Sequence, residues 1–357
     1  MSNDEEVFGG RSVENSMTNG AKLAIVIPCY NYASFVSRAI QSVISQRRED
    51  CELVVVDDGS TDGSWDVISR SGATAFRIEN SGHRRACLFG LDKTTAPFVL
   101  FLDADDEIKP GAIGKIIDRL DPDVAKLQFP LTRIDTDGNV ISAAFPGLDT
   151  FRDRRNLARQ VLRSGVYKSP PTSGNVFRRD LCQLLREADY DGFVDGVILF
   201  AAPFFGDVVS MSEEIGCYRI HGRNDSGLGR SPDAATIQRD IGRYLARMEH
   251  LRAIVGRLEP DRELVDPRDT FYYREREFCL EIVSGRRPRL TSLLGLIPKL
   301  LGEPFSVKNK IAMTAFDTLA AILPNSRARA LLAFRFKAGP RTAMGFAKEI
   351  VGLPARD

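Results

Sequence analysis

The sequence predicts an α/β fold, in which a mostly parallel sheet flanked by helices is followed by an α-helical C-terminal region. Three observations lead to this prediction. Apolar strands alternate with helices between Leu23 and Leu120, which is typical of a parallel sheet. The strands are nearly uninterrupted apolar runs, as expected when helices cover both faces. After Arg230 only helical patterns remain.

The alternation begins with two strand–helix units. "LAIVI", from Leu23, predicts a buried strand, and "ASFVSRAIQSVISQ" predicts a helix because its apolar residues recur at helical spacing. "ELVVVD" predicts the next strand. "DGSTDGSWDVISR" then predicts a turn into a helix, with Ser60, Thr61 or Asp62 as its N-cap.

Two more units follow, and then the pattern loosens. The units are "TAFRI" with "RRACLFGLDKTT", and "PFVLFL" with "KPGAIGKIIDRL", where Pro110 suits the first helical turn. Beyond Asp121, strands are predicted in "VAKLQFPLTRID", "GNVISAA" and "VVSMSEEIGCYRIHG", with a hairpin turn at "DTDGN". We predict a disordered tail over residues 1–20, a first domain over 21–230 that is large enough for catalysis, and a helical region over 231–357.

Composition excludes several classes of protein. The net charge of +1 argues against a nucleic-acid partner. The six cysteines are spread singly without a CxxC pair, so neither a disulfide framework nor a zinc site is predicted. The N-terminus lacks the apolar run of a signal peptide, and no stretch reaches the roughly 18 apolar residues of a membrane span. We therefore expect a cytoplasmic protein.

Acidic residues gather where two predicted strands end. Asp57 and Asp58 follow one strand, and Asp103, Asp105 and Asp106 follow another. Parallel sheets bind ligands at the carboxyl ends of their strands, so both groups are expected in one crevice. Clustered carboxylates suit Mg²⁺ or Mn²⁺, which takes one or two of them and completes its shell with water and substrate phosphates. The alternative for both groups is ordinary loop and helix-capping residues.

Several segments, in order, resemble the family-2 glycosyltransferases, which have the A-type glycosyltransferase fold. They are "IVIPCYNYASFVSRAIQSVISQ", "VVVDDGSTDGS", "FVLFLDADDEIKPGAI", "PTSGNVFRRDL", "GFVDGVILFAAPFFG" and "GCYRIHGRNDSG". The resemblance covers about Leu23 to Gly227 and leaves the C-terminal region uncovered. It implies a metal-dependent, inverting enzyme that transfers a sugar from a nucleotide-diphosphate sugar to an acceptor hydroxyl, in polysaccharide or glycoconjugate biosynthesis.

The resemblance also implies roles for individual residues. The donor-binding residues would be Pro28, Tyr30, Asn31, Asp58, Asp103 and His221, and the metal ligands Asp105 and Asp106. Asp58 would contact the base, and the ion would bridge the donor phosphates and neutralise the leaving diphosphate. Arg219, Arg223 and Asn224 accompany His221 and suit the same diphosphate. A satisfied structural histidine is the alternative for His221.

Transfer needs a base that takes the proton of the acceptor hydroxyl. The family places an acidic residue for this purpose downstream of the metal motif, and the matching segment is "YDGFVDGVILFAAPFFG". Asp195 is the predicted base and Asp191 the second choice. The structural alternative is that Asp195 caps the helix that begins after it. Residues 172–175 resemble an acceptor-side loop.

A catalytically inactive nucleotide-sugar-binding protein, or a membrane-associated scaffold, is the main alternative function. Two departures from the family pattern keep it open: Cys87 and Leu88 stand where many relatives have arginine and asparagine, and Val194 where many have glutamate. An aspartyl phosphohydrolase is disfavoured because Glu107 stands where that motif needs a hydroxyl. Nucleotidyltransferases and dinucleotide oxidoreductases are disfavoured because "IPCYNY" contains no glycine-rich loop.

The C-terminal region is basic and apolar. Between Arg286 and Lys348, 12 Lys and Arg stand against Glu303 and Asp317, so the net charge is 12 − 2 = +10. Basic amphipathic helices too short to span suit an anionic membrane surface. The acceptor would be a glycan or a lipid-linked glycan, and peripheral attachment at the inner face would suit the lipid-linked one. The alternative is a helical bundle packed on the catalytic domain or on a second subunit of a homo-oligomer.

Overall fold

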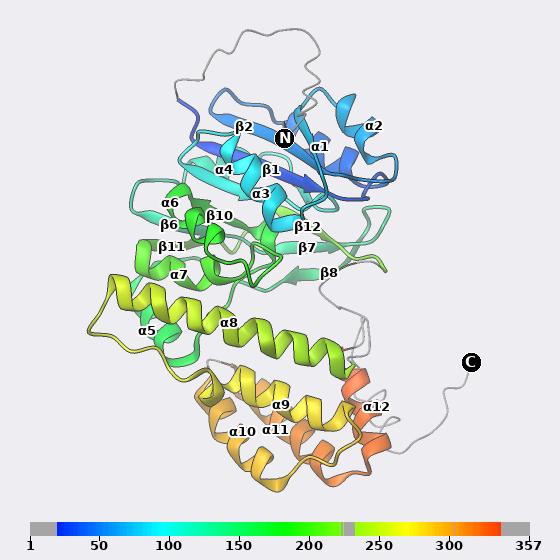
Figure 1. The fold of residues 1–357 in the computed structure, drawn as a ribbon, viewed down its shortest axis with the longest axis vertical. Coiled ribbons are helices and arrows are strands. Elements are labelled where there is room, and N and C mark those ends of the chain that lie inside the picture. The colour runs from blue at the N-terminus through cyan, green and yellow to red at the C-terminus, as the bar shows by residue number, and fades with distance from the viewer. Residues whose placement is uncertain (1–19, 223, 225–232, 304, 337–357) are drawn as a thin grey trace. The chain divides into compact units, whose positions relative to one another are not determined.

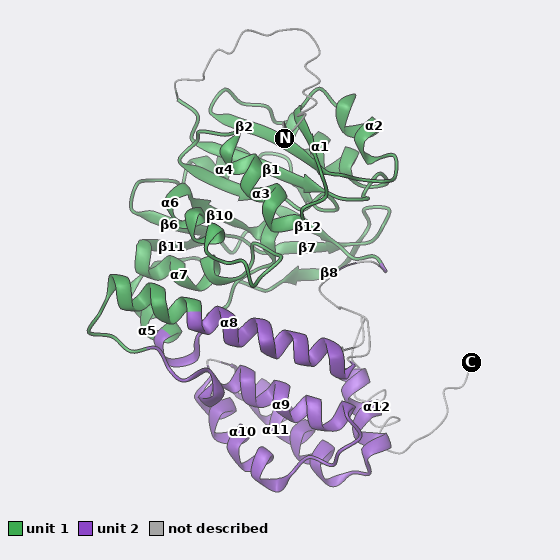
Figure 2. Ribbon diagram, viewed as in Figure 1, with its two compact units in different colours: residues 1–161, 166–221, 250–263 green, residues 162–165, 222–249, 264–357 purple. Residues whose placement is uncertain are grey.

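The computed structural model describes residues 20–222, 224, 233–303 and 305–336. Three predictions fall outside these residues: nearly all of the tail over 1–20, the boundary near Arg230 and the contribution of Arg223. The chain forms two compact units (Figure 2). Unit 1 comprises residues 1–161, 166–221 and 250–263, and unit 2 comprises residues 162–165, 222–249 and 264–357.

Unit 1 contains an eight-stranded sheet in the order β3-β2-β1-β4-β10-β6-β11-β9. Figure 1 labels β1, β2, β6, β10 and β11 of this sheet. The strands are β1 (Leu23–Cys29), β2 (Cys51–Asp58), β3 (Thr74–Ile78), β4 (Phe98–Phe101), β6 (Val124–Gln128), β9 (Phe151–Asp153), β10 (Asn175–Arg178) and β11 (Asp207–Ser210). β1 pairs in parallel with β2 and β4, and β2 with β3. β10 inserts antiparallel between β4 and β6. The mostly parallel sheet is confirmed.

Helices pack on the sheet through their apolar residues. They are α1 (Val36–Ile44), α2 (Ser64–Ser69), α3 (His83–Asp92), α4 (Ala112–Ile117), α5 (Arg155–Ser164), α6 (Arg179–Cys182) and α7 (Val197–Phe205). α1 buries the predicted stripe, including Val36, Ala39 and Ile40. α3 approaches β1 so closely that a Cβ on Gly90 would lie 2.3 Å from Cγ1 of Val26. Pro110 stands before α4, whose N-cap is Gly111, and not in its first turn.

A smaller sheet has the order β5-β12-β7-β8. Its strands are β5 (Glu107–Ile108), β7 (Leu131–Ile134), β8 (Val140–Phe145) and β12 (Gly216–Arg219). Two predicted single strands are each split between the sheets, because β6 and β7 separate at Phe129 and Pro130, and β11 and β12 at residues 211–215. β11 runs parallel to β6, and β12 parallel to β7. Because the chain passes from the large sheet to the small one, β12 pairs with β5, and its end lies beside the acidic motif.

Unit 2 is helical, as predicted for the C-terminal region. Its helices are most of α8 (Ala234–Leu258), and α9 (Phe271–Val283), α10 (Leu290–Gly302), α11 (Val307–Ile322) and α12 (Asn325–Phe336). Phe278, Leu296 and Leu331 are among the residues of their shared core. Within the described residues, no helix combines the length and apolarity needed to cross a bilayer.

One buried acid makes the stability of unit 2 depend on pH. Asp317 is fully buried, and Nη1 of Arg335 lies 3.7 Å from its Oδ1. Burial raises the pKa of Asp317 to about 7, although Arg335 opposes the shift. A carboxyl whose pKa is raised by folding stabilises the protein most below its unfolded pKa of about 4, and that stability is lost as the pH rises through 7.

We therefore expect Asp317→Asn to remove part of the loss of stability between pH 4 and pH 8. The wild-type urea midpoint should fall over this range relative to that of the variant, because only the wild type ionises a buried carboxyl there. Urea unfolding of both proteins at several pH values measures the difference. Parallel midpoints across the range would show that Asp317 does not titrate on unfolding.

Candidate active site

The loop after β1 is fixed to the loop after β2 by one asparagine. Asn31 has a φ of 60°, and its Oδ1 accepts the N–H groups of Thr61 at 2.8 Å and Asp62 at 3.2 Å. Tyr30 next to it is 43% exposed, whereas Pro28 is buried within β1. Of the residues predicted near the base, Tyr30 therefore presents its ring to solvent, and the Asn31 oxygen shapes the loop.

Asp58 ends β2 and holds the loop before α3. Its Oδ1 accepts the N–H of Ser81 at 2.8 Å, and its Oδ2 accepts that of Gly82 at 2.8 Å. The same loops touch at Gly59, which has a φ of 68° and where a Cβ would lie 2.7 Å from the backbone nitrogen of Asn80. Only glycine fits such an approach at positive φ. The contact of Asp58 with a base stays a prediction.

The acidic motif follows β4, and its carboxylates meet side chains from distant segments. The N–H of Asp103 donates to Oγ of Ser173 at 3.1 Å, and Oδ1 of Asp103 lies 3.1 Å from Nε2 of His83, on α3. Oδ2 of Asp105 lies 2.8 Å from Nε2 of His221, just after β12. Ser173, in the segment predicted to form an acceptor-side loop, thus bonds to the backbone of the acidic motif. Two carboxylates and two imidazoles converge at one strand end.

Asp105 and His221 form a hydrogen-bonded pair, and the distance between the two atoms also suits neighbouring ligands of one divalent ion. An octahedral ion with bonds of about 2.1 Å holds adjacent ligands about 3 Å apart, close to the 2.8 Å between Oδ2 and Nε2. The His221 ring is fixed by stacking on Phe35, with ring centroids 5.0 Å apart. Across the described residues, no three His, Cys, Asp or Glu side chains enclose an ion by themselves.

Asp106 is turned into the protein. It is 1% exposed, and its Oδ1 accepts the N–H of Arg219 at 2.9 Å. Burial raises the pKa of Asp106 well above its usual value, and the charges of Asp105 and Asp103 raise it further. The structure thus gives Asp106 a bond that joins the motif to β12. Its role as a metal ligand stays a prediction.

Arg219 supports the motif and does not reach solvent. Its side chain is fully buried. Nε donates to the carbonyl of Asp105 at 2.9 Å, Nη1 donates to the carbonyl of Asp135 at 2.7 Å, and Nη2 bonds to Glu107. The prediction that Arg219 serves the diphosphate is therefore wrong, because its guanidinium is enclosed and engaged by the protein.

The segment that contains the predicted base packs against the start of α3. This segment, residues 191–196, precedes α7. The N–H of Arg84 donates to the carbonyl of Gly192 at 2.9 Å, and the rings of Phe193 and His83 lie 5.7 Å apart. Since His83 also contacts the acidic motif, the segment and the motif share one neighbour.

The two candidate bases have different environments. Asp191 is 4% exposed, and its Oδ1 accepts the N–H of Phe193 at 3.2 Å. Asp195 is half-buried and so is more accessible than Asp191. The N-cap of α7 is Gly196, so Asp195 does not occupy the capping position. These environments favour Asp195 as the group that meets a substrate, and the assignment stays a prediction.

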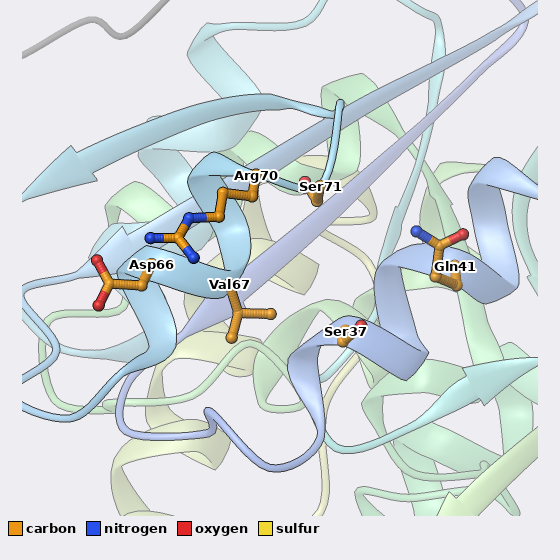
Figure 3. Close-up of a pocket in the computed structure, with 6 residues that line it drawn as sticks. All are labelled: Ser37, Gln41, Asp66, Val67, Arg70 and Ser71. Carbon is orange, nitrogen blue, oxygen red and sulfur yellow. The ribbon is translucent and has the colours of Figure 1, made fainter.

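A depression in the surface lies between α1 and α2 (Figure 3). Its lining residues are Ser37, Gln41, Asp66, Val67, Arg70 and Ser71. None of the predicted site residues lines it. The chemistry described above therefore belongs to the carboxyl ends of the strands and not to this depression.

Residues 24–185 match the family model described as glycosyl transferase family 2. A GalNAc(5)-diNAcBac-PP-undecaprenol beta-1,3-glucosyltransferase of Campylobacter jejuni is 30% identical over 252 residues, which cover 68% of this chain and 77% of the relative. The chain belongs to glycosyltransferase family 2. The A-type fold expected from the sequence is confirmed with it.

Other relatives carry the glycosyltransferase name. An uncharacterized glycosyltransferase of Nostoc sp. is 36% identical over 217 residues, which are 57% of this chain. The chain spans 66% of that relative, slightly less than two thirds of its length. Among solved structures, S. aureus TarS 1-349 in complex with UDP-GlcNAc is 14% identical, with a TM-score of 0.48 over 92% of this chain and 88% of that one.

The family model covers only part of the site. Asp58, Asp103 and Asp105 lie within the matched residues 24–185, whereas Asp195 and His221 lie beyond them. His83 is a site residue that the sequence reasoning for this family-2 glycosyltransferase missed. The available signal was its position, because a histidine directly after the loop that follows β3 stands at the same sheet edge as the acidic motif.

Replacing His83 by alanine is expected to lower kcat/KM for transfer by about 10- to 100-fold. Alanine removes the hydrogen-bond partner of Asp103, and outer partners that orient the residues of a metal site are worth about that much. His83→Gln keeps a polar group near the same carboxylate and should retain more activity than His83→Ala. Steady-state kinetics of both variants check the expectation, and equal losses in the two would contradict it.

Proposed function

We propose that this protein transfers a sugar from a nucleoside-diphosphate sugar to an acceptor hydroxyl by metal-dependent single displacement with inversion. The observation that carries the proposal is the pairing of Asp105 with His221 at 2.8 Å beside Asp103. A carboxylate and an imidazole at the distance of neighbouring metal ligands, at the carboxyl end of a parallel strand, suit a divalent ion that binds a diphosphate. Membership of glycosyltransferase family 2 supports it.

The residues have the following proposed roles. Asp105 and His221 hold Mg²⁺ or Mn²⁺, with Asp103 beside them and Asp106 securing the motif. When bound, the ion would stabilise the negative charge that develops on the departing nucleoside diphosphate. Asp195 accepts the proton of the acceptor hydroxyl as that oxygen attacks the anomeric carbon.

The nucleoside is proposed to bind over the loops that follow β1 and β2. Tyr30 is exposed enough to contact it, while Pro28 and Asn31 shape the floor beneath. The carboxylate oxygens of Asp58 already accept two N–H bonds from the loop before α3. Asp58 contacts the base if these oxygens also accept a hydrogen bond from it. That loop therefore responds to nucleotide in this proposal.

For the acceptor we propose a lipid-linked glycan at the inner face of the cytoplasmic membrane. The Campylobacter jejuni relative is named for a polyprenyl-diphosphate-linked acceptor. The six cysteines in the described residues are free thiols, as suits a cytoplasmic protein. The C-terminal basic helices supply a means of attachment without a membrane span.

A thermal-shift screen of nucleoside diphosphates tests the donor proposal. Each nucleotide is added with Mn²⁺, with Mg²⁺ and with a chelator, because a ligand that binds only the folded state raises its melting temperature. We expect one nucleotide class to raise Tm by several degrees only when the metal is present. Equal shifts with metal and with chelator, or no shift for any nucleotide, would contradict the proposal.

A further inference from the structure

Helices α10 and α11 expose two apolar stripes. Leu290, Leu294 and Leu301 are 69%, 62% and 56% exposed and lie within about 40° of one another on α10, at about 100° per residue. On α11 the exposed residues are Val307, Ile311 and Ile322, at 74%, 66% and 62%, and they also share one side. The buried residues of each helix, such as Leu296 and Ala320, lie on another side. These six exposed residues are called the α10–α11 apolar stripes below.

The two stripes run along one antiparallel pair. At one end, Nζ of Lys310 donates to the carbonyl of Leu301 at 2.7 Å. At the other end, Nη2 of Arg287, just before α10, donates to the carbonyl of Ile322 at 2.9 Å. The end of α10 therefore lies beside the start of α11, and the start of α10 beside the end of α11. Both stripes therefore lie on one antiparallel helix pair of unit 2.

The chain segment that carries the stripes is strongly basic, although Asp269 and Glu281 from neighbouring segments contact Lys299 and Ser292 of α10. Residues 286–336 contain nine Lys and Arg and only two acidic residues, Glu303 and Asp317. Asp317 is fully buried, and Glu303 is half-buried with a pKa that burial raises. Arg287 and Lys308 are exposed and lie at the stripes. The stripes are therefore flanked along the chain by exposed basic side chains.

We infer that the α10–α11 apolar stripes dock on an anionic lipid bilayer, with the leucine and isoleucine side chains among the acyl chains and the flanking basic residues at the headgroups. This arrangement is that of an interfacial amphipathic helix. A second copy of the chain fits less well, because an isologous contact would bring the same positive charges together. The inference deepens the membrane attachment proposed above and rests on that proposal for its acceptor.

Vesicle co-sedimentation of the full chain tests the inference. The probes are vesicles of phosphatidylcholine alone and of phosphatidylcholine mixed with phosphatidylglycerol. We expect binding to the anionic vesicles only. Leu294→Ser with Leu301→Ser should weaken that binding by at least about tenfold, and Lys308→Gln by about fivefold. Ile141→Gln and Arg47→Gln are the matched controls, since both side chains are exposed in unit 1, and they should bind like the wild type.

Several outcomes would overturn the inference. These are equal binding to both vesicles, no binding to either, or unchanged binding by the leucine double variant. A wild-type dimer in light scattering that the double variant converts to a monomer would also overturn it and would assign the stripes to a second copy. Nucleotide binding in solution is measured on the same variants and should not change. A protein that binds vesicles but no nucleotide would defeat the donor proposal alone.

Discussion

Asp105→Ala is expected to reduce sugar transfer by about a thousandfold or more and to abolish metal-dependent nucleotide binding. The carboxylate is 2.8 Å from Nε2 of His221 and has only 11% of its side chain exposed, so no other group can take its place without rearrangement. An ion that neutralises a leaving diphosphate is worth several kcal/mol, which corresponds to about that loss in rate. Transfer assays and calorimetric titration of nucleotide with Mn²⁺ measure the two effects.

The matched control for this variant is Asp137→Asn, which removes a carboxylate from the exposed β7–β8 turn. It should transfer sugar like the wild type. The Asp105→Ala protein should fold, because Arg219 keeps its bonds to Asp106 and to Glu107. Thermal unfolding of the variant checks this. Retained Mn²⁺-dependent nucleotide affinity in a folded Asp105→Ala protein would contradict the assignment.

Asp195→Asn is expected to lower kcat by about 10²- to 10⁴-fold while leaving nucleotide affinity unchanged. A general base contributes about that factor, and an amide cannot accept the proton. Rapid-quench or steady-state transfer assays give kcat, and nucleotide titration gives affinity. An inactive scaffold, the alternative function, would show no transfer in the wild type either.

Asp191→Asn distinguishes the two candidate bases. Asp191 is 4% exposed and accepts the N–H of Phe193, so its replacement should lower stability more than kcat. The amide oxygen of asparagine still accepts that hydrogen bond, so the protein should fold. If Asp191→Asn suffers the large loss in kcat and Asp195→Asn does not, the roles are reversed.

The sequence was informative where a pattern is local. The stripe of α1, the hairpin turn after β7 and the five C-terminal helices follow from spacing and turn residues within a few positions of one another. The gathering of Asp103 and Asp105 at a strand end also followed, because strand direction alone places their loops at one edge of the sheet.

Long-range pairing could not be predicted in the same way. β10 enters the sheet between β4 and β6 although about 75 residues separate it from β4, and no spacing rule identifies such a partner. Arg219 illustrates the same limit for side chains, since it lies 113 positions from Asp106. Its burial reverses the role that its charge suggested. Asp58 likewise bonds to a loop 23 positions away, which its own segment does not reveal.

A crystal structure with Mn²⁺ and the nucleoside diphosphate selected by the thermal-shift screen shows whether Asp105 and His221 hold the ion, because anomalous scattering locates it. We expect one peak bounded by Oδ2 of Asp105, Nε2 of His221 and both phosphates of the nucleotide. Nucleotide bound at the strand ends with no peak there, or a peak that contacts neither Asp105 nor His221, would contradict it.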